Sequence, residues 1–159
     1  MTIPIPSLPP YRYRGARACV ILHEQKLREF IAVWKEAKAI GTVSLPKTND
    51  QDYASFDHLL QHVLRASRGY ITWCCEKLEL PDPDVPPTPE AEEIAVQADE
   101  YLEVLLEKLR APLAEVPEER FDEVFQSRWK VDYCIDAMLE HAVMHPIRHA
   151  FQLRELMSN

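Results

Sequence analysis

Three histidines stand four residues apart near the C-terminal end of the chain: His141, His145 and His149. Four residues of α-helix advance about 400°, so successive imidazoles lie about 40° apart around the axis and roughly 6 Å apart along it. Two histidines in this arrangement can bind one metal ion. A third from another helix would complete a three-histidine site with coordination positions left for water or substrate.

The apolar residues around these histidines indicate which of them point inward. His145 and His149 belong to a stripe with steps of three and four residues, whereas His141 lies on its flank. Because His141 and His149 are separated by roughly 12 Å of helix rise, one ion is not expected to bind all three. We expect His145 to pair with His149, and His141 with His145 is the alternative. The full stripe comprises Ile135, Met138, Ala142, His145, His149, Gln152 and Leu156.

A third ligand has to come from another segment, and His62 is predicted to supply it. Its neighbours at helical spacing include Leu59 and Val63, so it faces an apolar surface. His58 lies closer to the start of the same helix, among polar residues. His23 lies near the start of the first helix in a polar run, which argues against it as a ligand.

The distribution of glycine and proline predicts the fold. Only 3 glycines occur in 159 residues, while 13 prolines cluster outside the periodic segments. This pattern is typical of long helices separated by stiff loops. No segment shows convincing strand alternation. The fold class is therefore predicted to be all-α, a four-helix bundle with long loops between the helices. We expect the first helix over about residues 17–40. The second is expected to start between residues 51 and 55 and to end near residue 80. The third should cover about residues 88–110, and the fourth should run from about residue 131 almost to the C-terminus.

The domain organisation follows from the length. Residues 1–159 are expected to form a single domain, with an irregular proline-rich arm at about residues 1–16. Thr88, Pro89 and the acids after them predict a capped start for the third helix. Pro146 lies inside the fourth helix between the favoured ligands. It is either a tolerated kink or a bend that turns His145 and His149 toward a common point.

The formal net charge of −8 argues against a nucleic acid partner, since binding to a phosphate backbone needs a basic face. No apolar run approaches the ~18 residues that span a bilayer, and the N-terminus lacks the features of a signal peptide. We therefore expect a cytoplasmic protein without a membrane partner. We expect exposed apolar surface near the helix ends, from Trp34, Ile71 or Trp73, which would suit a homodimer.

The four cysteines show neither metal-type spacing nor a disulfide pattern. We interpret them as reduced and mostly buried, and a packing role is favoured over a catalytic thiol. Cys74 and Cys75 point about 100° apart on a helix, which predicts that at most one faces the core.

Two of these segments resemble the DinB/YfiT-like metal-binding four-helix bundles. The last-helix signature of that family is similar to L-L-x-H-x-x-x-H-E-x-H-H-R-G-Q. Residues 138–152 keep its first three spaced histidines and its terminal glutamine, Gln152. The second-helix pattern, similar to S-L-x-E-L-L-x-H-I, looks like residues 55–63. The resemblance implies that His62, His145 and His149 are the metal ligands and that His141 is not usually one.

The chain departs from the family pattern at four positions of the last helix. Pro146 replaces the acidic residue, Arg148 replaces a histidine, and Ala150 and Phe151 replace Arg-Gly. The three ligand positions are intact, so these changes bear on the surroundings of the site and on the substrate.

The donor set and the resemblance lead to two hypotheses of function. Three imidazoles favour a divalent ion, zinc or nickel above all. In the first hypothesis this ion activates a low-molecular-weight thiol or a water for transfer or hydrolysis of a small-molecule substrate, as the family implies. In the second, the protein is a non-catalytic, metal-binding or metal-free stress-related bundle that acts as a binding or dimerisation module. An open pocket beside the ion favours the enzyme, whereas closure of the site by His141 favours the module. Neither Asp136 nor Glu140 lies on the inward stripe, so no general base is predicted.

Overall fold

The computed structural model describes residues 6–159, and it confirms an all-α four-helix bundle. Residues 1–5 of the expected arm lie outside the described residues. Residues 6–13 contain no helix, and the first helix begins three residues earlier than expected. The helices are α1 (Arg14–Ile40), α2 (Phe56–Lys77), α3 (Ala91–Leu109) and α4 (Ile135–Ser158).

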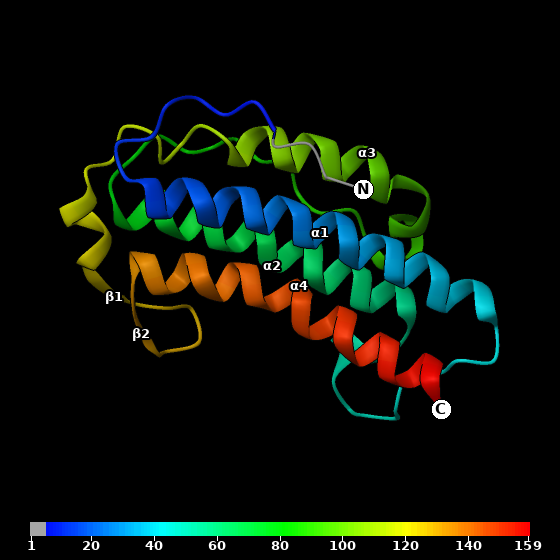
Figure 1. The fold of residues 1–159 in the computed structure, drawn as a ribbon. Helices are drawn as coiled ribbons and strands as arrows, with labels where there is room; N and C mark the ends of the chain where they lie inside the picture. The colour runs from blue at the N-terminus through cyan, green and yellow to red at the C-terminus, as the bar shows by residue number, and fades with distance from the viewer. Residues whose placement is uncertain (1–5) are drawn as a thin grey trace.

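Helices α1 and α4 run in one direction, and α2 and α3 run in the other (Figure 1). Arg154 near the end of α4 pairs with Glu29 of α1 at 2.8 Å. The loop of residues 79–90 returns along α2 and so allows two successive helices to be parallel. Arg68 Nε of α2 donates hydrogen bonds of 3.1 Å to the carbonyl oxygens of Val85 and Pro86 in this loop.

Apolar side chains from all four helices meet in one core. Of the stripe expected in α4, Gln152 is exposed and Leu156 is partly exposed, and the other residues are buried. Phe30 of α1, Leu60 of α2, Leu105 of α3 and Ile135 of α4 are completely enclosed. Burial of such side chains is the main source of stability in a bundle of this size.

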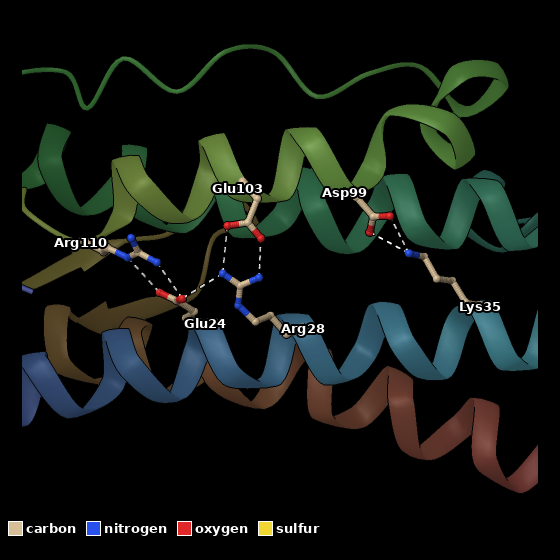
Figure 2. Close-up of polar contacts among 6 residues, drawn as sticks. All are labelled: Glu24, Arg28, Lys35, Asp99, Glu103 and Arg110. Atoms are coloured by element: carbon tan, nitrogen blue, oxygen red, sulfur yellow. Dashed lines mark hydrogen bonds and ion pairs between the residues drawn. The ribbon is translucent and has the colours of Figure 1, made fainter. Parts of the chain in front are cut away.

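Charged side chains join α1 to α3 (Figure 2). The carboxylate of Glu24 is buried and accepts hydrogen bonds from Arg110 Nε at 3.1 Å and Nη2 at 2.8 Å. Arg28 bridges Glu24 and Glu103, with Nη2 distances of 3.2 Å and 3.0 Å. These pairs fix the antiparallel alignment of the two helices, because each guanidinium needs its own carboxylate opposite it.

Two helix starts differ from the expectation. Thr88 does not cap α3: its hydroxyl lies 3.0 Å from the hydroxyl of Tyr101, and the helix begins at Ala91. The second segment is divided into the 3₁₀ turn η1 (Gln51–Tyr53) and α2, whose first turn is capped by Ser55 Oγ. This division places residues 51–53 outside the axis of α2.

The connection before α4 contains structure that the sequence pattern does not reveal. It holds the 3₁₀ turn η2 (Glu118–Asp122) and an antiparallel hairpin of β1 (Val124–Gln126) and β2 (Asp132–Cys134). Consequently α4 begins at Ile135 rather than near residue 131. Strands of three residues are too short to show a clear alternation of polar and apolar side chains. The helix then continues through Pro146 without a break.

Two expectations about burial are wrong. Trp34, Ile71 and Trp73 are each only 3% exposed, so they provide no surface for a homodimer, which stays a prediction without this support. Cys74 and Cys75 are both buried, because α2 is covered on more than one side. Among residues 6–159, no helix is both long and apolar enough to cross a lipid bilayer.

Candidate metal centre

The fold brings His62 of α2 together with His145 and His149 of α4. One ligand nitrogen from each lies within 4.8 Å of the other two. The Nε2 atoms of His62 and His145 are 3.0 Å apart. Two nitrogen ligands of one tetrahedral zinc lie about 3.3 Å apart, given Zn–N bonds of about 2.0–2.1 Å. The three side chains can therefore reach one ion with small movements.

Two neighbouring side chains fix the orientation of the outer rings. Asp52 Oδ2 lies 2.9 Å from His62 Nδ1, and Gln152 Oε1 lies 2.9 Å from His149 Nδ1. Each oxygen accepts the proton on Nδ1, so the lone pair on Nε2 is directed into the space between the rings. Hydrogen bonds of this kind are typical of histidines that bind metals.

The His145 ring is the least satisfied polar group of the cluster. Its Nδ1 atom is buried and has no hydrogen-bond partner, and its Nε2 atom meets only the imidazole of His62. An unpaired buried polar atom costs about 1–3 kcal/mol. One ligand nitrogen of His145 also lies within 4.8 Å of a ligand nitrogen from each of the two other imidazoles, so the donor set fits a cation.

The electrostatic environment keeps these imidazoles neutral. Burial, followed by the neighbouring His149 and His62, lowers the pKa of His145 to about 2. Burial also lowers the pKa of His149 to about 4, and it lowers the pKa of His62 against the opposing effect of Asp52. Neutral imidazole is the form that binds a metal, so no proton has to leave at neutral pH.

His141 lies outside the three-histidine cluster. Its ring packs against Tyr70, Trp129 and Tyr133, with centroid separations of 5.3, 5.4 and 5.6 Å. The ring centroid of His145 is 6.4 Å away. His141 therefore belongs to an aromatic wall beside the cluster, and the alternative pairing of His141 with His145 is not the one the structure brings together.

An open pocket of about 530 Å³ adjoins His62 and His145. This volume is in the range of small-molecule sites. The hairpin supplies one wall, because the side chains of Arg128 and Trp129 come from its turn. The remaining walls come from α2, α4 and η1. In addition to Arg128 and Trp129, the lining residues are Asp52, His62, Arg65, Ala66, Gly69, Tyr70, Trp73, Met138, His141 and His145.

The other candidate residues lie elsewhere. His58 Nδ1 is 2.8 Å from Ser55 Oγ at the start of α2. His23 is buried, contrary to the expectation from its polar neighbours, and its Nε2 atom lies 3.2 Å from Ser67 Oγ. Glu140 is exposed and Asp136 is partly exposed. Asp52 is the acidic residue of the site, and its position in a short turn gave no periodic signal.

The cysteines are free, and burial raises the pKa of the thiols of Cys19, Cys74 and Cys75. The pKa of Cys19 and that of Cys75 are raised to about 11. These thiols are therefore protonated at neutral pH and are poor nucleophiles, in keeping with a packing role.

Comparison with known proteins adds no relative from which a role could be transferred. No protein-family model, curated protein or solved structure matches the chain.

Proposed function

We propose that this protein is a metal-dependent enzyme of the DinB/YfiT-like type. His62, His145 and His149 would hold one divalent ion, zinc or nickel, and the reaction would be transfer or hydrolysis with a low-molecular-weight thiol or water as nucleophile. The observation that carries the proposal is a three-histidine cluster beside an open pocket, with His141 packed among aromatic rings outside the cluster.

The bound ion would act as a Lewis acid and lower the pKa of a water or thiol in its open position. The chain's own residues account for binding and orientation. Asp52 and Gln152 hold two imidazoles with Nε2 inward. Tyr70 and Trp129 line the pocket and present apolar ring surface to it. The large apolar part of the lining suits a small organic substrate.

The alternative is a non-catalytic bundle in which the same ion is structural. It predicts a closed coordination sphere, with a fourth protein ligand in place of an exchangeable position. His141 is the remaining histidine of α4 that could serve as this fourth ligand. Because its ring packs in the aromatic wall, the coordination position is left open, which favours the enzyme.

Metal analysis tests the first part of the proposal. Protein purified without an affinity tag is expected to carry about one divalent ion per chain, as three imidazoles suffice for a catalytic site. His145→Ala should abolish binding, and His141→Ala should leave the stoichiometry unchanged as a matched control on the same helix. Equal metal content in His145→Ala and wild type would show that the ligands are misassigned.

A spectroscopic experiment separates the enzyme from the structural alternative. The protein is loaded with cobalt, and 2-mercaptoethanol is added. An open site should give a sulfur-to-metal charge-transfer band in both wild type and His141→Ala. A band that appears only in His141→Ala would mean that His141 closes the site, and the catalytic proposal would then be wrong.

A further inference from the structure

The pocket beside the histidines is rich in aromatic rings. Tyr70, Trp129 and His141 lie in contact, and Tyr70 and Trp129 meet edge to face at a centroid distance of 6.4 Å. Trp73 lines the same pocket. Aromatic walls of this kind favour a flat apolar group, which can stack on one ring and meet the edge of another.

The charges of the pocket do not cancel. Its charged lining residues are Asp52, Arg65 and Arg128. Asp52 is paired with Arg65 at 2.6 Å as well as with His62. Within residues 6–159, Arg128 forms no ion pair, and its hydrogen bond is a long one of 3.4 Å to the neutral hydroxyl of Thr72. The pocket therefore offers an unpaired guanidinium in a protein whose formal net charge is −8.

No carboxylate in residues 6–159 forms an ion pair with Arg128. Glu76 and Arg128 both line the adjoining surface depression, where Glu76 pairs with Lys77 at 2.9 Å and Arg128 has only a smaller effect in lowering the pKa of Glu76. Arg148, two helical turns after His141 on the same face of α4, is exposed and also forms no ion pair in the described part of the chain. The pocket lining thus carries two guanidinium groups against one carboxylate, which favours the binding of an anion.

The hairpin holds Arg128 in place. Ser127 N donates to Val131 O at 2.8 Å, and Ser127 Oγ accepts from Val131 N at 3.0 Å, which closes the turn around Arg128. Trp73 Nε1 of α2 donates to Gln126 O at 3.2 Å and ties the hairpin to the bundle. The guanidinium is carried on an anchored turn and not on a free loop.

The position of Arg128 sets the length of a ligand. A Cβ atom at Gly69 would lie 3.6 Å from Arg128 Nη1, so the guanidinium lies over Gly69 of α2. Gly69 follows His62 by seven residues, a rise of about 10 Å along the helix. A molecule that reaches from the histidines to Arg128 is therefore about the length of a substituted bicyclic ring.

We propose that the pocket binds a small organic anion with a flat apolar body. Its carboxylate, or an equivalent anionic group, binds Arg128, and the body lies among Tyr70, Trp73 and Trp129. The opposite end faces His62 and His145. That this ligand is a substrate rests on the proposed function. The preference of the pocket for an anion can be measured whether or not the protein is an enzyme.

The test compares naphthalene-2-carboxylate with naphthalene-2-carboxamide, a neutral analogue of the same shape, by titration calorimetry at low ionic strength. Wild type should bind the carboxylate roughly ten-fold more tightly or better, the factor expected of one charge-assisted hydrogen bond. Arg128→Gln should bind both compounds alike. Lys130→Gln is the matched control: it removes the same charge from the same turn outside the pocket lining, and it should keep the preference.

Repeating the titrations on chelator-treated protein separates this inference from the proposed function. The preference for the carboxylate should persist without metal, because Arg128 provides it. If Arg128→Gln keeps the preference, or if the preference disappears with the metal, the anion is bound by the ion and the inference is wrong. Equal affinity for both compounds in wild type, or binding of neither, also overturns it. If wild-type protein binds no metal ion, only the proposed function is refuted.

Discussion

Asp52 Oδ2 lies 2.9 Å from His62 Nδ1, and Oδ1 of the same carboxylate lies 2.6 Å from Arg65 Nη2. The carboxylate therefore has one oxygen for orienting a candidate ligand and one for the guanidinium that holds it in place. Because η1 carries Asp52, this turn is part of the proposed metal site although it supplies no ligand.

We expect Asp52→Ala to weaken zinc binding by about 10–100-fold, since His62 would lose the acceptor that fixes its tautomer. A competition titration with a chromophoric chelator measures the change. Asp57→Ala is the control, because Asp57 pairs with Lys38 and does not touch the histidines. Zinc affinity in Asp52→Ala equal to that of the control would contradict the orienting role.

Glu24→Gln is expected to lower the free energy of unfolding by about 2 kcal/mol. The substitution leaves Arg110 and Arg28 facing a buried neutral group, but both arginines remain partly exposed to water, which reduces the loss. Urea denaturation measures the effect. Glu103→Gln, whose side chain is 60% exposed, should cost less than about 1 kcal/mol. Equal losses in the two variants would mean that burial of Glu24 is not what makes it important.

Substitution of two glycines by alanine should change the stability of the protein in opposite directions. Gly41 ends α1 with φ at 75°, and a Cβ there meets no atom within 4 Å, so Gly41→Ala should cost about 1 kcal/mol through the backbone alone. Gly69 lies within α2, where alanine is the better helix former. Gly69→Ala should stabilise the protein by roughly 0.5–1 kcal/mol, because its new Cβ makes only an ordinary contact. Thermal unfolding of the two variants and of wild type shows whether each substitution stabilises or destabilises the protein.

His23 should make the protein sensitive to acid. Burial lowers its pKa from 6.5 to about 4, so between these values the unfolded state binds a proton that the folded state does not. The corresponding stability is present above pH 6.5 and is lost as the pH falls toward 4. At pH 4 the loss from this residue amounts to about 3 kcal/mol.

The measurement is urea denaturation of metal-free wild type and His23→Gln at pH 8 and pH 4. The variant should lose about 3 kcal/mol less than wild type over this interval, because glutamine does not titrate there. Equal losses in both proteins would show that His23 titrates normally in the folded state.

The sequence was sufficient for the bundle and for the grouping of the three histidines, but not for their surroundings. His145 and His149 share the apolar stripe of α4, and helical periodicity carries that information. His62 has an equally apolar neighbourhood in α2. Asp52 belongs to a turn that the pattern merged with α2, and its approach to His62 depends on the path of the chain before the helix.

Local composition misled at positions where several elements pack on one helix. His23 is followed by Glu24, Gln25 and Lys26, yet it is buried because Ser67 offers it a partner and Glu24 is itself enclosed by arginines. Trp73 was expected at the surface, and the hairpin covers it by accepting its indole N–H at Gln126. Such burial depends on segments far away in sequence, which local periodicity does not report.

The hairpin has a consequence for the exchange of ligands. It pairs two strands of three residues, whereas α2 and α4, which form much of the rest of the pocket, are helices of 22 and 24 residues. Segments with so few backbone hydrogen bonds open at a lower free energy than the global unfolding transition. Amide hydrogens of β1 and β2 should therefore exchange faster than those in the middle of α2 and α4. We therefore expect a bound molecule to leave by transient opening of the wall that carries Arg128 and Trp129, against its anchoring bond from Trp73, while the three histidines stay together.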